Sequence, residues 1–277
     1  MLDLNKVRGI VRYELRMRWR SWRYWIVFLM AGALALFVPT PLNYPVPEDG
    51  YKFVSSWWMA GQAFSGLTLL MTLLAAFLVA DRIVRDTTLR TKESVKVRAV
   101  GEAEYVLGKY LASLIALALI AGSVFVGIPI TKWVITGTLM SLWPLLVAFL
   151  TMYLPPMAFV TALALTVTTL LVDSLRFYVP FAVLWFFDSM RFRPLSSWVR
   201  GVFNFSGASP FQAFFSDVAL FKAGDPQMPQ LSPSVVAANI FFLLLTSGLL
   251  LAVLVSFEKR RGERGAELEP RKDKRWP

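Results

Sequence analysis

The charged side chains that could do chemistry in this sequence are carboxylates, lysines and arginines, because it contains neither His nor Cys. Without those two residue types the chain cannot form a histidine general base, a Ser/His/Asp triad, a thiol nucleophile, a histidine zinc site or a disulfide. Carboxylate chemistry stays open, but the clearest acids near apolar stretches are Asp173 and Asp188. No GxxxxGK[ST] phosphate-binding loop occurs, which excludes nucleotide hydrolysis by that route. We therefore expect no catalytic residue, no metal site and no cofactor in this chain.

The densest group of charges lies between residues 81 and 104, where six basic residues are interspersed with five acidic ones. A loop that faced only anionic lipid would be mainly basic, whereas charges of both signs suit contacts with a protein surface. Val95, Val97 and Val100 add apolar side chains that could dock. Two interpretations stay open, a docking surface for a partner protein and an ordinary solvated loop.

The elements that must position these charges are apolar runs typical of an integral membrane protein. Hydrophobic residues make up 56% of the chain, charged residues 17%, and the mean hydropathy is +0.56. Crossing a hydrocarbon layer of about 30 Å takes roughly 20 apolar residues in a helix. The runs predict an all-α fold with six spans, at about 22–38, 59–79, 106–128, 143–172, 177–190 and 235–257.

The long apolar stretch 143–190 is interrupted only at 173–176, where we expect a tight turn between a long and a short span. Pro155 and Pro156 lie inside the longer span and remove two backbone donors. They predict a kink or a break in that helix.

Basic residues predict the orientation, because cytoplasmic flanks retain Lys and Arg during insertion. With both termini inside, most of the 29 basic residues fall on the inner face, including 81–104 and a basic cytoplasmic tail at 258–277. We therefore expect a multi-pass membrane protein with both termini inside, and we predict its location as the plasma membrane of a prokaryotic cell. The basic residues lie where lipid headgroups would be, so we expect no nucleic-acid partner.

The amino-terminal segment predicts an amphipathic helix in the inner membrane interface, because basic residues recur every four positions beside an apolar arc. Glu14 and Arg18 interrupt that arc. Two interpretations stay open, a lipid-surface anchor and a contact of Glu14, with the neighbouring Arg16, to a partner protein. The stripe is Arg8, Arg12, Arg16 and Arg20, and the arc is Leu4, Val7, Val11, Leu15 and Trp22.

These features together resemble the permease subunits of type 2 ABC exporters (ABC-2 permeases). In that family the charged stretch after the second span reads approximately R-E-x-x-x-G-T-x-E, followed by an apolar run, a Pro, and G-K at the start of the third span. Here Arg90 and Ala99 stand where the family has Gly and Pro. The positions that match are Arg85-Asp86, Thr91, Glu93 and Gly108-Lys109, together with the Glu of Tyr13-Glu14-Leu15-Arg16.

The resemblance implies that residues 1–257 form a single permease domain, one half of a transmembrane pore. It implies a second permease chain, identical or different, and cytoplasmic ATPase subunits that bind ATP and Mg²⁺. The segment 81–104 would contain the coupling helix that contacts the ATPase. The coupling residues implied are Arg85, Asp86, Arg90, Thr91, Glu93, Val95, Arg98, Gly101 and Glu102.

The external segment 191–234 is too apolar for a free loop, and we expect it to re-enter the membrane. The resemblance implies short helices there that close the pore from outside, with Ser209, Pro210, Phe211 and Phe214 as the external gate. A folded cap without a gating role is the alternative. For the whole chain, a membrane-embedded enzyme and a regulatory or structural membrane protein are the alternatives to a permease.

Overall fold

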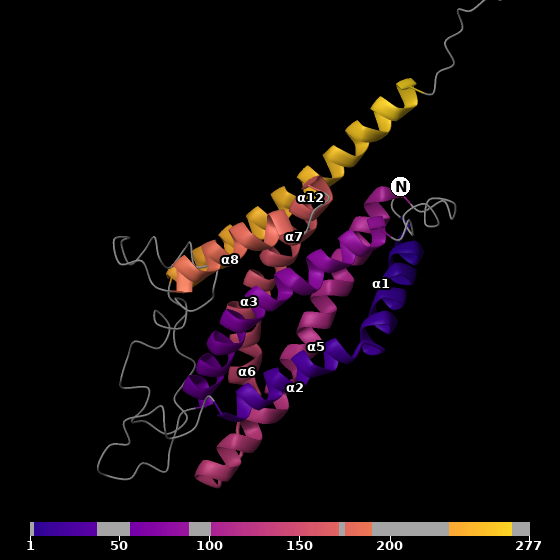
Figure 1. Ribbon diagram of the computed structural model, residues 1–277. Coiled ribbons are helices and arrows are strands. Elements are labelled where there is room, and N and C mark those ends of the chain that lie inside the picture. The colour runs from indigo at the N-terminus through magenta and orange to yellow at the C-terminus, as the bar shows by residue number, and fades with distance from the viewer. Residues whose placement is uncertain (1–2, 38–55, 89–100, 172–174, 190–232, 268–277) are drawn as a thin grey trace, which may run out of the picture.

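The computed structural model describes residues 3–37, 56–88, 101–171, 175–189 and 233–267. These residues are almost entirely helical and include no strand, which confirms the all-α prediction for this part of the chain. Figure 1 shows the arrangement of the helices. The elements are α1 (Leu4–Trp19), α2 (Trp22–Phe37), α3 (Ser56–Thr88), α5 (Glu102–Thr136), α6 (Trp143–Ala148), the π-helical η2 (Phe149–Tyr153), α7 (Leu154–Leu171), α8 (Leu175–Ser189) and α12 (Pro233–Glu267).

Two helical stretches among the described residues are long and apolar enough to cross a membrane, Ala103–Ile135 and Trp143–Thr169. Three shorter apolar stretches lie at Trp22–Leu34, Met59–Ala75 and Asn239–Val255. The count of six spans and their orientation stay predictions.

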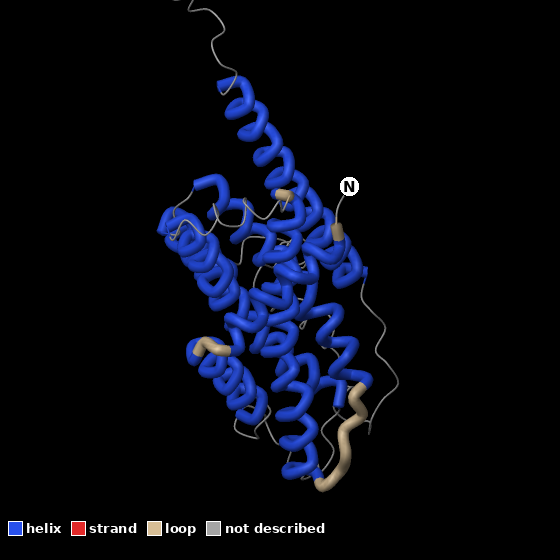
Figure 2. Tube along the Cα trace, turned by 90° about the vertical axis from the view of Figure 1, so that its right-hand side faces the viewer, coloured by secondary structure: helices blue, strands red, loops and turns tan. Residues whose placement is uncertain are grey.

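Several helices continue beyond the apolar runs that predict them. Helix α3 extends through Thr88, so the first third of the charged segment 81–104 is helical. No Pro or Gly occurs in residues 81–88, so nothing in that stretch stops the helix once it has formed. Helix α12 likewise extends through Glu267, into the basic tail, and projects beyond the other helices (Figures 1 and 2).

The centre of the bundle is built by α3, α5 and α7. Helices α1 and α2 pack along α5, while α12 packs along α7. An aromatic cluster joins α3, α5 and η2, the segment that leads into α7, and its ring centroids are separated by 5.7 to 6.1 Å. Its members are Phe64, Phe125, Phe149 and Tyr153, and the Tyr153 hydroxyl donates a hydrogen bond of 2.9 Å to the Leu117 carbonyl.

The proline pair coincides with an irregular turn in the helix that runs from Trp143 to Leu171. The five-residue π-helical segment Phe149–Tyr153 is separated from Pro155 and Pro156 by Leu154 alone. A proline ring crowds the carbonyl four residues earlier and offers no N–H, and a wider turn is one way to relieve this. We attribute the π-helical turn to these prolines. The helix is not broken there, because residues 143–171 are continuously helical, and the predicted kink stays a prediction.

The two described ends of the charged segment lie at the same end of the bundle. Phe64 of α3 contacts Phe125 of the antiparallel α5. Thr88 follows Phe64 by as many residues as Gly101 precedes Phe125. Because α3 and α5 are antiparallel, Thr88 and Gly101 both lie about 36 Å from this contact, at 1.5 Å per residue, toward the same end of the bundle. The carboxyl-terminal part of α12 also reaches this end, where Val253 packs against Val106.

Candidate functional site

The best-defined group of polar contacts lies where α1 packs on the first turns of α5. We call this contact the α1–α5 junction. It comprises Asp3, Lys6, Ile10, Glu14 and Arg18 of the amino-terminal segment, and Gly101, Glu104, Tyr105, Gly108, Lys109 and Ser113 from the start of α5.

A local sequence signal starts α1, and a hydrogen bond joins its end to α2. Asp3 is its N-cap, and the carboxylate accepts a hydrogen bond of 2.9 Å from the Asn5 backbone N–H. The helix ends at Trp19, and after Arg20 and Ser21 the chain continues as α2. The Trp19 carbonyl accepts a hydrogen bond of 2.9 Å from the Trp25 indole N–H, which ties the end of α1 to the first turn of α2.

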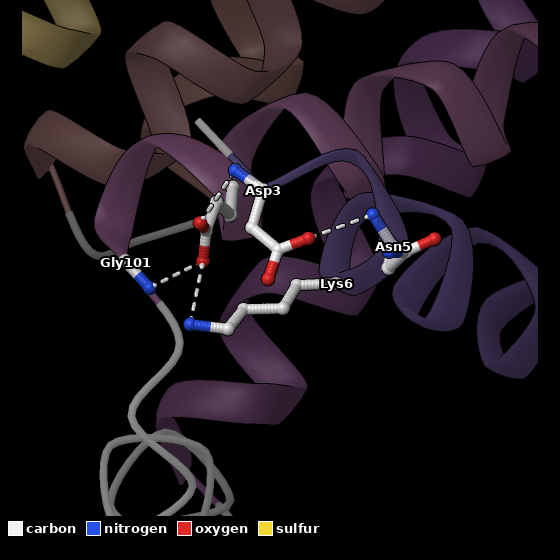
Figure 3. A network of polar contacts seen from close by, with 5 residues as sticks. Asp3, Asn5, Lys6 and Gly101 are labelled. Carbon is white, nitrogen blue, oxygen red and sulfur yellow. Dashed lines mark hydrogen bonds and ion pairs between the residues drawn. The ribbon is translucent and has the colours of Figure 1, made fainter. Parts of the chain in front are cut away.

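Glu104 holds the beginnings of both helices. Its Oε2 accepts a hydrogen bond of 2.8 Å from the N–H of Gly101, the N-cap of α5. Its Oε1 accepts one of 3.0 Å from the Asp3 N–H, and Lys6 Nζ lies 4.0 Å from Oε2. Figure 3 shows Asp3, Lys6 and Gly101 around this carboxylate. One buried side chain therefore satisfies backbone donors from two segments far apart in the sequence.

A buried ion pair lies deeper in the α1–α5 junction. Glu14 Oε1 and Lys109 Nζ are 3.5 Å apart, and each side chain is only 6% exposed. The ammonium also lies 4.9 Å from the centre of the Tyr105 ring, a cation–π distance. The attraction between the two charges offsets the cost of removing each from water. Replacing only one of the two residues by an uncharged one would leave the other as a buried charge without its partner.

Arg18 makes the last polar contact of the α1–α5 junction. It is 4% exposed, and its Nη2 donates a hydrogen bond of 2.7 Å to Ser113 Oγ. This contact lies one helical turn beyond the Glu14–Lys109 pair on both helices. The polar contacts therefore continue along α1 rather than forming a single point of attachment.

Gly108 permits the close approach of the two helices. A Cβ atom at this position would lie 2.7 Å from Ile10 Cγ2 and 2.8 Å from Ile10 Cβ. Real Cβ contacts are not that short, so any other residue would push α1 away from α5. The Gly108-Lys109 pair thus has two separate roles in the α1–α5 junction, room for α1 and a charge for Glu14.

The structure describes the surroundings of the predicted apolar arc and of the two residues that interrupt it. Leu4 is 73% exposed and Trp22 is 67% exposed, whereas the two residues that interrupt the arc, Glu14 and Arg18, are buried. Val7 of the arc is also buried, and Lys109 of α5 supplies a cation opposite Glu14. Glu14 accordingly has its ion-pair partner within the chain, and Arg16 is exposed.

Only part of the predicted coupling segment lies among the described residues. Arg85 and Asp86 belong to the last turns of α3, Gly101 is the N-cap of α5, and Glu102 is its first residue. The side chains of Arg85, Asp86 and Glu102 are outside the description, as is that of Asp188 in α8. Residues wholly outside it are Arg90, Thr91, Glu93, Val95, Arg98, Asp173, Ser209, Pro210, Phe211 and Phe214.

Sequence reasoning placed Glu14 and Lys109 in separate motifs and missed that they pair. A signal was present, because Glu14 interrupts the predicted apolar arc and Lys109 lies in an apolar run. Burying two charges of opposite sign costs free energy unless they pair. Glu104 and Ser113 carried no such signal. A further buried contact lies near the other end of α5, where Lys132 Nζ donates to Ser56 Oγ at the start of α3.

The α1–α5 junction is suited to holding two helices together rather than to transforming a substrate. Within the described ranges, no group of three or more acidic side chains is placed to bind a metal ion. Comparison of the sequence with models of known protein families, and with curated proteins, finds no match in either.

Proposed function

We propose that this chain is the permease half of an ATP-driven exporter of the ABC-2 type. In this proposal six helices cross the membrane and both termini are cytoplasmic. The chain provides half of a translocation pathway, and a separate cytoplasmic subunit hydrolyses ATP. The observation that carries the proposal is the α1–α5 junction at the end of the charged segment 81–104.

The α1–α5 junction supports mechanical coupling because it attaches the charged segment to two helices at once. Gly101, the last residue before α5, bonds to Glu104, and Glu104 bonds to the start of α1. A force on the segment would therefore reach α5 directly and α1 through Glu104 and Lys6. Packed helices shift as rigid bodies rather than deforming, so such a force would move them together.

The other end of the segment also joins a rigid element. Helix α3 continues to Thr88 and so carries Arg85 and Asp86 beyond its apolar part, which ends at Ala80. A partner that grips the segment would act on α3 as well as on α5. Both helices contribute to the central core, so movement at this end would be transmitted into the bundle.

The proposal is tested by isolating the chain from its native membranes with an affinity tag. We expect a protein with a GxxxxGK[ST] loop to co-purify, and the double variant Asp86→Lys and Glu93→Lys to lose it. A matched control is the double variant Glu48→Lys and Asp49→Lys, which makes the same charge change on the predicted external side. The control should retain the ATPase.

Two results would contradict the proposal in different ways. Absence of any ATP-hydrolysing partner under conditions that preserve membrane complexes would overturn the permease assignment. Equal recovery of the ATPase with the segment variant and with the control would overturn the assignment of the contact to residues 86 and 93.

A further inference from the structure

The face of α1 that lies away from α5 carries four exposed arginines, Arg8, Arg12, Arg16 and Arg20. At about 100° per residue, their arc is centred about 160° from the buried face of the helix. The buried face is that of Val7, Glu14 and Arg18. The helix therefore has two separate polar faces, one that contacts α5 and one that is available to an external ligand.

The exposed arginines have no carboxylate partner among the described side chains. The acids of the segment 3–37 are Asp3 and Glu14, and both are engaged elsewhere. Asp3 caps α1, and Glu14 pairs with Lys109. On α5, Glu104 is occupied by Gly101, the Asp3 N–H and Lys6. The face is therefore strongly cationic, and the ligand that it suits is an anion.

Exposed tryptophans adjoin the arginines where α1 meets α2. Trp19, on the arginine side of α1, is 53% exposed, and Trp22 and Trp25 of α2 are 67% and 40% exposed. The rings of Trp19 and Trp25 meet edge to face, with centroids 5.9 Å apart. Exposed indoles beside basic residues are typical of the boundary between lipid headgroups and hydrocarbon.

If α5 crosses the membrane, as in the proposed function, α1 lies at the depth of the boundary between lipid headgroups and hydrocarbon. The contacts of α1 with α5 extend from Glu104 to Ser113. This range is about 14 Å of helix rise, at the very start of the apolar stretch Ala103–Ile135. A headgroup layer and the outermost hydrocarbon together occupy a similar depth, roughly 10 Å. The arginines would then lie beside lipid phosphates.

We propose that the arginine face of α1 binds the phosphate groups of anionic phospholipids, and that this binding holds α1 in the α1–α5 junction. Guanidinium groups bind phosphate through paired, charge-assisted hydrogen bonds. Net negative lipid charge is required, because the phosphate of a zwitterionic lipid is already neutralised by its own cation. The adjoining indoles select a membrane surface over a soluble acidic protein or a nucleic acid.

The experiment measures lipid binding to the purified full chain in detergent, by native mass spectrometry with phosphatidylglycerol or phosphatidylcholine. We expect the unmodified chain to prefer phosphatidylglycerol. The fourfold variant Arg8→Gln, Arg12→Gln, Arg16→Gln and Arg20→Gln should lose the preference. Each basic residue near an anionic surface contributes roughly fivefold in affinity, so the loss of all four is expected to weaken binding by about 600-fold. The matched control replaces the same four residues by Lys and should keep most of the preference.

A second measurement separates loss of the lipid site from loss of the fold. Thermal unfolding in phosphatidylcholine nanodiscs should be similar for the Gln and Lys variants, and phosphatidylglycerol should stabilise only the unmodified chain and the Lys variant. Equal binding of the two lipids by the unmodified chain would overturn the proposal. So would a preference that survives in the Gln variant.

Extraction of native membranes with alkaline carbonate distinguishes failure of this proposal from failure of the permease assignment. Release of the chain into the soluble fraction would overturn both, since the depth argument requires α5 to cross the membrane. A chain that stays in the membrane and co-purifies with an ATPase, yet shows no preference for anionic lipid, would overturn the lipid site alone.

Discussion

Glu14 of α1 and Lys109 of α5 form an ion pair of 3.5 Å in which both side chains are almost completely buried. The pair lies between the Glu104 contacts at the start of the helices and the Arg18–Ser113 hydrogen bond further along. It is therefore part of a continuous line of polar contacts. Such a line fixes the position of α1 along α5, because a shift in either direction would leave buried charges without partners.

Removing either charge of this pair should destabilise the protein. Glu14→Met and Lys109→Met are each expected to lower the free energy of unfolding by about 3–5 kcal/mol, because one buried charge loses its partner. The double variant should recover most of the loss, since methionines of similar length fill the space without charge. Chemical unfolding of the four proteins in detergent measures the coupling. Arg16→Met is the control, and as an exposed neighbour it should change stability by less than about 0.5 kcal/mol.

Two glycines of α5 should respond to the same substitution with opposite signs. Gly108→Ala places a Cβ against Ile10 and is expected to cost about 1–3 kcal/mol. A Cβ added at Gly122 would have no neighbouring atom within 4 Å, so Gly122→Ala should gain about 0.8 kcal/mol from helix propensity. Thermal unfolding of both variants provides the comparison. Stabilisation by Gly108→Ala would show that α1 does not approach α5 as closely as described.

The Tyr153 hydroxyl should contribute to stability through its single described hydrogen bond. Tyr153 is fully buried and donates to the Leu117 carbonyl on α5, so Tyr153→Phe is expected to cost about 0.5–1.5 kcal/mol. Tyr13 is 63% exposed, and Tyr13→Phe serves as the control that removes the same atom from the surface. Equal unfolding midpoints for the two variants would contradict the contact.

A buried hydroxyl without a partner predicts a stabilising substitution. Thr161 is fully buried in α7, and its Oγ1 has no hydrogen-bond partner among the described residues. Thr161→Val removes a desolvated polar group while keeping the shape of the side chain, and should gain about 1 kcal/mol. Thr168→Val is the matched control, because Thr168 Oγ1 donates to the Ala164 carbonyl. The control should lose stability, and a loss in both variants would indicate an unseen partner for Thr161.

The sequence by itself predicted where the helices lie, because hydropathy and helix breakers act locally. The apolar run 106–128 lies within α5, and the proline pair follows the π-helical turn. Of the turn predicted at 173–176, residues 173 and 174 lie outside the described residues, whereas Leu175 and Arg176 already belong to α8. Local signals were less useful for the ends of helices. Helix α3 continues to Thr88 because propagation needs only backbone hydrogen bonds and no breaker, whereas the prediction followed the end of the apolar run.

Only the tertiary structure decided which side chains of α1 are buried and what they bind. Periodicity grouped Glu14 with an apolar arc, but it could not identify Lys109 as the partner, because the pairing depends on the way α1 crosses α5. That crossing is possible only where a residue without a side chain, Gly108, lets Ile10 approach. The sequence thus determined that α1 has a cationic face, while the close packing of two distant segments decided that its opposite face is a buried polar attachment.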